Sequence, residues 1–190
     1  MMPQNKLSQD VSTTEFLNKE RVSDLLDFEL GGIALQDVSS GLSVKDWSCY
    51  YLDNQIILDD GEGFTKSVLT IEGVTQLSFC FSISMIYYIA YTNQDGCFLY
   101  WYDTTINDYS TLKLPDGTEN PQLSLDERRS FNLNNSDVIL SYTNGNSLIC
   151  RNQRDRFGTE YVLSNETKGK LLQSGIAKNG RFCFKFEGWE

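Results

Sequence analysis

Apolar and polar residues alternate with a period of two over much of the chain, most clearly from residue 76 onward. Leu77, Phe79 and Phe81 are separated from one another by smaller residues. Successive side chains of a β-strand point to opposite faces of its sheet, so this alternation predicts a strand with one face packed on a core. Three further strands of one antiparallel meander are predicted at residues 87–92, 97–102 and 109–114.

A hairpin unit occurs twice in the sequence. Residues 88–103 contain an apolar strand, a turn with Gly96 and a second apolar strand, and residues 138–151 repeat this order around Gly145. A repeat of about 50 residues is typical of architectures built from successive β-sheets, such as the blades of a β-propeller. The repeat therefore indicates at least two similar sheets.

Other strands follow from the same reasoning. Ahead of the first meander, strands are predicted at 33–35, 42–52, 55–58 and 67–71. Asp53 and Asn54 are predicted to form a hairpin turn. Residues 115–135 are predicted to be a long polar connection with one short strand at 122–125. A second meander is predicted over 137–143, 147–152, 159–163, 171–177 and 181–186.

The number of strands bounds the fold class. About a dozen strands correspond to three four-stranded blades, one fewer than the smallest common closed propeller. We therefore expect an all-β protein of antiparallel meanders that is either propeller-like or a sandwich, and the sequence leaves both alternatives open.

The first 30 residues differ from the remainder. Residues 1–13 are polar and are expected to be flexible until something binds them. Further along, apolar residues recur at spacings of three to five, which predicts a short amphipathic α-helix before Gly31 and Gly32. Its apolar positions are Phe16, Leu17, Val22, Leu25, Leu26 and Phe28. We expect residues 1–30 to form an arm that packs on the sheet or docks onto a partner, ahead of a β-meander domain at 31–190.

Charge and hydropathy exclude several classes of function. The 190 residues carry a net charge of −10 and no extended Lys/Arg cluster, so a nucleic-acid partner is not expected. No apolar run approaches the roughly 20 residues of a membrane helix, and the first residues lack the pattern of a signal peptide. We expect a soluble, unsecreted protein with no membrane insertion.

The residues that carry most catalytic and metal-binding chemistry are scarce. The chain has no histidine, which removes Ser-His-Asp and Cys-His catalysis and most zinc sites. Five cysteines are widely spaced and mostly lie in apolar runs, so we expect them to behave as small buried hydrophobic residues. Their positions are Cys49, Cys80, Cys97, Cys150 and Cys183. No cofactor, no metal and no enzymatic activity are expected.

Two polar loops are candidate binding sites. Residues 59–63 contain three carboxylates, but they lack the spacing of a calcium loop, so an acidic turn is favoured. Arg154 and Arg156 flank Asp155 directly after a predicted strand. This arrangement is typical of an ion pair at the edge of a sheet; the alternative is a guanidinium surface that binds a carboxylate of a partner or glycan.

Sugar chemistry is the remaining alternative. A glycoside hydrolase needs two carboxylates about 5 to 9.5 Å apart. The acidic residues from which such a pair could be built are Asp126, Glu127, Asp155 and Glu160, and similar sets occur in most acidic proteins. Tyr100 and Trp101 are candidates for stacking on a glycan, although aromatic residues at strand spacing are more often part of a core.

Three stretches of the chain resemble small structural proteins encoded among the tail genes of tailed bacteriophages. The first, residues 29–42, reads ELGGIALQDVSSGL. The second, residues 98–104, reads FLYWYDT. The third comprises SDVILSY at 136–142, QRDRF at 153–157 and KLLQSG at 170–175.

This resemblance covers residues 28–186 and rests on recurring hairpin and turn residues. It implies a non-enzymatic virion protein that forms or attaches the tail-tip, nozzle or fibre region, in several symmetry-related copies. The expected location is the virion tail after assembly in the host cytoplasm, and the expected partners are other tail proteins and copies of this chain. Partner contact is expected at the apolar residues of the N-terminal arm and at Arg154 and Arg156. The alternative function is a receptor- or carbohydrate-binding module of the adsorption apparatus, with Tyr100 and Trp101 contacting host glycan.

Overall fold

The structure is a computed structural model that describes residues 17–21, 36–37, 42–43, 47–82, 84, 86–126, 136–176 and 182–187. The described chain is nearly all β, and its strands form three four-stranded sheets and two two-stranded sheets, all antiparallel. It contains no α-helix, and hence no helix long and apolar enough to cross a membrane, within these residues. The predicted all-β class with antiparallel meanders is confirmed.

The three large sheets follow one another along the chain. The first sheet contains, in spatial order, β1 (Leu17–Arg21), β4 (Ser48–Leu52), β5 (Gln55–Asp59) and β6 (Thr65–Thr70). The second sheet contains β7 (Gln76–Phe81), β8 (Tyr87–Asn93), β9 (Gly96–Asp103) and β10 (Asp108–Lys113). The third sheet contains β11 (Thr118–Leu125), β12 (Val138–Asn144), β13 (Ser147–Asn152) and β14 (Tyr161–Ser164).

Two short sheets complete the fold. One is the hairpin of β15 (Leu171–Ile176) and β16 (Phe182–Phe186), and the other pairs β2 (Gln36–Asp37) with β3 (Leu42–Ser43). The sequence predicted β15 and β16 as part of a meander that continues the third sheet. In the structure these two strands pair only with each other among the described strands, so that part of the prediction is wrong.

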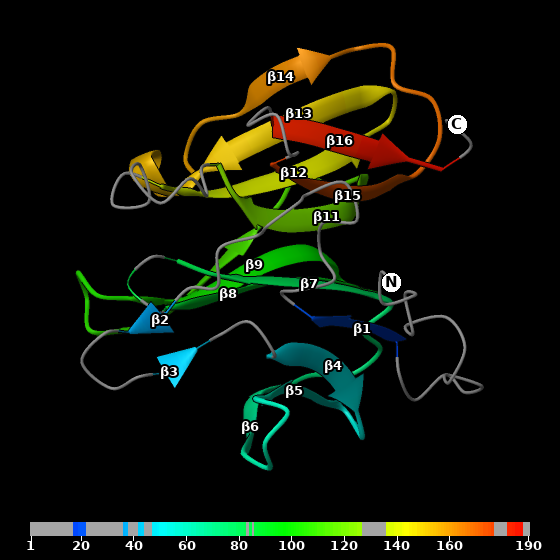
Figure 1. Ribbon diagram of the computed structural model, residues 1–190. Helices are drawn as coiled ribbons and strands as arrows, with labels where there is room; N and C mark the ends of the chain where they lie inside the picture. Colours follow the sequence, from blue (N-terminus) through cyan, green and yellow to red (C-terminus); the bar gives the residue numbers. More distant parts are fainter. Residues whose placement is uncertain are drawn as a thin grey trace, which may run out of the picture.

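The sheets are layered in the order of the sequence, from the first sheet at one end to the third sheet at the other (Figure 1). The strands that begin successive meanders are in contact: β4 contacts β7, β7 contacts β11, and β11 contacts β15. Strand β1 also contacts β7. One contiguous hydrophobic core therefore runs between the layers instead of a separate core for each sheet.

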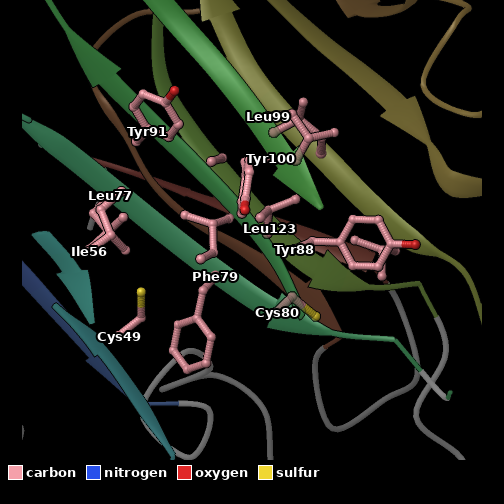
Figure 2. Packing of buried hydrophobic residues seen from close by; sticks show 14 of the residues in the cluster. Cys49, Ile56, Leu77, Phe79, Cys80, Tyr88, Tyr91, Leu99, Tyr100 and Leu123 are labelled. Carbon is pink, nitrogen blue, oxygen red and sulfur yellow. The ribbon is translucent and has the colours of Figure 1, made fainter. Parts of the chain in front are cut away.

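Figure 2 shows this core, with side chains from the first, second and third sheets gathered in one region. Cys49 and Ile56 come from the first sheet, Phe79 and Leu99 from the second, and Leu123 from the third, and each is at most 1% exposed. The two faces of the second sheet are both covered, because Leu77, Phe79 and Phe81 face one neighbouring sheet while Ser78 faces the other. This explains why its alternation is between large and small residues, and not between apolar and charged ones.

The repeated hairpin corresponds to equivalent parts of two sheets. Its first copy forms β8 and β9, and its second copy forms β12 and β13, which are the second and third strands of their meanders. The turn predicted at Asp53 and Asn54 is also confirmed, since both residues have the positive φ angles, 49° and 62°, that a tight hairpin turn requires.

Strand β11 is longer than predicted. The sequence predicts a strand only at 122–125 and leaves 118–121, which include Glu119, Asn120 and Pro121, in a polar connection. In the structure the register shifts between Glu119 and Gln122, and Asn120 has a φ of 53°. This β-bulge accommodates Pro121 within a strand at the edge of its sheet, where the missing N–H removes no ladder hydrogen bond.

The helix predicted for the N-terminal arm is not shown. Residues Leu17–Arg21 form β1, which pairs with β4, so the helical prediction is wrong for these residues. An isolated amphipathic helix of this length is marginal in water, and the backbone of β4 offers hydrogen-bond partners that outweigh a weak helical preference. The other predicted contact residues of the arm, Phe16, Val22, Leu25 and Leu26, lie outside the described residues.

Candidate interaction site

The segment between β13 and β14 forms a compact turn that brings several predicted residues together. It begins with a 3-10 helix, Gln153–Asp155, and Asn152 caps this helix by accepting a hydrogen bond from the Asp155 N–H at 3.1 Å. Arg156 and Phe157 follow with φ angles of 57° and 60°. Two consecutive non-glycine residues in the left-handed region cost free energy, so contacts elsewhere must hold this turn in place.

Phe157 supplies the main contact. Its side chain is 1% exposed and packs between two aromatic rings of the second sheet, Tyr88 and Trp101, with ring centroids 5.7 and 5.8 Å away. The turn of the third sheet is thus anchored in the second sheet, which compensates for the cost of its backbone conformation.

Both arginines of the turn form ion pairs within the chain. Arg156 pairs with Asp103 of the second sheet, and Arg154 pairs with Asp137 at 2.8 Å. Hydrogen bonds from Thr105, followed by those from Arg156, hold the pKa of Asp103 below its usual range. The expected ion pair at a sheet edge is therefore present. The Arg154 and Arg156 side chains remain 73% and 62% exposed, so both still present donors to solvent, and their contact with a partner stays a prediction.

A third arginine, Arg151, is buried behind this turn. Its guanidinium donates to the Tyr142 hydroxyl at 3.0 Å, to the Phe157 carbonyl oxygen at 2.6 Å and to Glu160 at 2.6 Å. Tyr142 also donates to Glu160 at 2.7 Å. These hydrogen bonds lower the pKa of Glu160 and keep its carboxylate charged beside Arg151. Buried polar groups satisfied in this way fix one conformation of the turn.

Strand β14, which follows the turn, has an unusual surface. Tyr161, Val162 and Leu163 are 45%, 54% and 52% exposed although they are consecutive and apolar. The last strands of the other two meanders carry charges instead, Lys66 on β6 and Asp108 and Lys113 on β10. Charges on an edge strand discourage pairing with other chains, whereas an uncharged apolar edge favours it.

We call Tyr161, Val162 and Leu163 the β14 patch. The sequence analysis placed a strand here but did not identify it as an interaction site. A signal was present, because three consecutive apolar residues break the alternation expected of a strand with one buried face. The ladder with β13 is also irregular at this point, since its register shifts between Leu148 and Ile149.

The two residues predicted to contact glycan point in opposite directions. Trp101 stacks on Tyr88 at 6.4 Å on the face toward the third sheet, whereas the Tyr100 hydroxyl donates to the Val68 carbonyl oxygen at 3.3 Å on the face toward the first sheet. Adjacent residues of a strand cannot share a face, so Tyr100 and Trp101 do not form one platform. Tyr100 is also 8% exposed and belongs to the core.

Tyr100 instead forms the base of a tyrosine cluster with Tyr87, Tyr102 and Tyr109. The ring of Tyr109 stacks on Tyr100 at 5.1 Å and meets Tyr102 edge-on at 5.3 Å. The hydroxyl groups of Tyr87 and Tyr109 are hydrogen-bonded at 2.8 Å. Sequence reasoning missed this cluster because it depends on which residues of β8, β9 and β10 share a face.

The remaining candidates serve the fold. In the acidic loop, Asp60 accepts hydrogen bonds from the backbone of Glu62 and Phe64, as expected for an acidic turn. Among the described residues no group of acidic or cysteine side chains could hold a metal ion. A small cavity of about 100 Å³ lies where β7, β11 and β15 begin, beside Gln76 and Asn120, but both side chains are engaged in hydrogen bonds between sheets.

The described carboxylates considered for glycoside hydrolysis are all engaged in hydrogen bonds within the chain. Asp126 accepts hydrogen bonds from the Asp137 N–H and the Ser136 hydroxyl, Asp155 accepts one from Tyr161, and Glu160 is bound by Arg151. Glu127 lies outside the described residues. Each of the three described carboxylates therefore stabilises a local turn or network.

Comparison of the chain with protein-family models, with curated protein sequences and with solved structures finds no match. The resemblance to tail proteins therefore stays a prediction, and function has to be argued from the sheets and surfaces described above.

Proposed function

We propose that the chain is a non-enzymatic structural protein of a bacteriophage tail, which forms or attaches the tail-tip, nozzle or fibre region by assembling with other tail proteins and further copies of itself. The sequence resemblance motivates this proposal. The observation that carries it is the β14 patch, an uncharged apolar edge on a scaffold in which β6 and β10, the last strands of the other two meanders, carry charges.

A propeller-like arrangement of the sheets supports a scaffold role. Each large sheet is a meander in sequence order, apart from the added β1, and the strands that begin successive meanders pack on one another. This is the relationship between neighbouring blades of a propeller, and it favours the propeller-like alternative over a sandwich. Such layers resist deformation when ion pairs and buried rings join them, as the Arg156–Asp103 pair and Phe157 do here.

The β14 patch is suited to homo-oligomeric contact. The chain carries a net charge of −10, so two copies repel one another at long range. Residues 161–165 contain no charged side chain, and contact between two β14 strands brings no like charges directly together. Several weak contacts of this kind stabilise a ring through multivalency even where each buries a modest area.

Quantitative mass spectrometry of purified particles from the phage that encodes the chain tests this proposal. We expect the chain in the particles at a fixed ratio to the other tail proteins, and in tails separated from heads. Abundant chain in the lysate, without any in washed particles, would contradict the proposal.

A further inference from the structure

The tyrosine cluster lies at the outer rim between the first and second sheets. Tyr100 anchors it in the core at 8% exposure, while Tyr109 on the outer strand β10 is 41% exposed. Tyr87 and Tyr102 are half-buried between them. The rings thus form a ledge whose inner part is fixed and whose outer part meets solvent.

The ledge differs from the tyrosines that serve only the core. The side chains of three of these, Tyr88, Tyr91 and Tyr142, are between 0% and 4% exposed, so no ligand can reach their rings. In the ledge, stacking and hydrogen bonds hold the rings in place at the surface. Rings fixed in advance lose little conformational freedom when a ligand binds, so the ledge is preorganised for recognition.

Polar groups surround the exposed ring. The Tyr102 hydroxyl donates to the Asn107 side chain at 2.6 Å, and the Lys66 ammonium lies 5.4 Å from the centroid of the Tyr87 ring. In the hydroxyl pair of Tyr87 and Tyr109, one O–H donates to the other oxygen. The second O–H has no acceptor among the described residues. Burial and this hydrogen bond raise the pKa of Tyr87, so its hydroxyl stays protonated at neutral pH.

We propose that Tyr87, Tyr102 and Tyr109 form a binding platform for a neutral pyranose ring of a surface polysaccharide, since a chain of net charge −10 repels an anionic sugar. Such a ring has an apolar C–H face that packs on aromatic rings, and peripheral hydroxyl groups that donate and accept hydrogen bonds. The ledge offers an aromatic surface bordered by the Tyr hydroxyls, Asn107 and Lys66, which matches both properties.

Other ligand classes fit this surface less well. Nucleic acid also stacks on aromatic rings. Lys66 adds only its own positive charge to the ledge, however, and the net charge of −10 on the chain repels a phosphate backbone. A purely apolar peptide would cover the second O–H of the Tyr87–Tyr109 pair and the Lys66 ammonium without offering them an acceptor. The inference goes beyond the assembly role, because a tail protein assembles whether or not it binds sugar.

NMR titration tests this proposal by measuring how the full chain binds three probes: maltohexaose, cello-oligosaccharides and oligogalacturonate. We expect saturable binding to at least one of the two neutral probes. Replacing the stacked ring in Tyr109→Ala should weaken binding by about tenfold or more, consistent with loss of roughly 1.4 kcal/mol. Tyr109→Phe keeps the ring and should weaken it less. Binding of oligogalacturonate alone would overturn the choice of a neutral pyranose.

Leu172→Ala provides the matched control, because Leu172 lies on β15, outside the ledge and the β14 patch, and is 40% exposed against 41% for Tyr109. This variant should bind sugar as the unchanged chain does. Equal losses in both variants, unchanged binding in a folded Tyr109→Ala variant, or no binding of any probe would overturn the proposal. None of these results would affect the mass-spectrometric test of the tail function.

Discussion

The side-chain hydroxyl of Ser78 accepts a hydrogen bond from the backbone N–H of Leu123 at 2.9 Å, and this contact joins the second sheet to the third. Nearby, Gln76 accepts one from the backbone N–H of Asn120 at 2.9 Å. Strand β11 is the edge of its sheet, and side chains of β7 take the place of a neighbouring strand at these two positions. The layers are therefore connected by directional contacts as well as by apolar packing.

Removing the hydroxyl in Ser78→Ala should lower the free energy of unfolding by about 1 to 3 kcal/mol, because the Leu123 N–H is left buried without a partner. Urea unfolding followed by circular dichroism measures this change. Ser67→Ala on the exposed strand β6 is the control and should change stability by less than about 0.5 kcal/mol. Equal stability of both variants would show that this contact does not hold the layers.

Phe157→Ala should be more damaging, with a loss of about 3 to 5 kcal/mol, since it removes a buried ring between two sheets and the anchor of a strained turn. Arg154→Ala in the same turn breaks only an exposed ion pair and should cost less than about 1 kcal/mol. Thermal and urea unfolding compare the two. Similar small losses would mean that Phe157 does not anchor the turn.

Much of the fold could be predicted because its strands are apolar runs bounded by turn residues. Strand β7 shows a period of two, in which large residues alternate with small ones although both faces are buried, and Asp53-Asn54 marks a hairpin by its tolerance of positive φ. Strand β11 was underestimated, because the bulge that admits Pro121 is created by pairing with β12 and packing on β7. Strand β1 was misassigned, because its partner β4 lies about 30 residues further along.

The candidate site was predictable only in part. Ion pairs of Arg154 and Arg156 were expected at the sheet edge, but their partners, Asp137 and Asp103, are not neighbours in the sequence, and Asp103 is 53 residues from Arg156. The placement of Tyr100 and Trp101 on opposite faces could have been deduced from the strand period alone. The tyrosine ledge could not, since it requires the register between β9 and β10, which pairs Tyr102 with Tyr109.

Stability should fall as the solution is acidified below about pH 4. The pKa values of Asp103 and Glu160 are lowered in the folded chain, so the unfolded chain binds more protons in this range and protonation favours unfolding. Their contribution is fully present at neutral pH. Urea midpoints between pH 6 and pH 3 measure the effect, and Asp103→Asn should show a shallower pH dependence. If the urea midpoint of Asp103→Asn changes with pH as steeply as that of the unchanged chain, the role given to Asp103 is contradicted.

The thiols should differ in reactivity. Cys49, Cys80, Cys97 and Cys150 are buried, as the sequence predicted, and Cys183 is half-buried. Burial raises the pKa of Cys97 and Cys150 to about 11, which keeps the reactive thiolate rare at neutral pH. Iodoacetamide followed by mass spectrometry should label Cys183 first in the native chain and all five cysteines in urea. Rapid native labelling of Cys97 would contradict this packing.

Val162→Lys should abolish self-association through the β14 patch, because it places a charge at the proposed contact between copies. Ile106→Lys is matched in exposure, 57% against 54%, and lies in a turn outside the patch. Sedimentation velocity over a range of concentrations should show oligomers for the unchanged chain and for Ile106→Lys, and monomers for Val162→Lys. Identical behaviour of all three would exclude the patch as the contact.

The most direct test of the proposed function is the position of the chain in the virion. Particles of the encoding phage can be labelled with a gold-conjugated antibody to this domain and viewed by electron microscopy. The account predicts gold at the tail, concentrated at the tip, nozzle or fibre-attachment region. Gold on the head alone, or particles without gold beside abundant free protein, would contradict it.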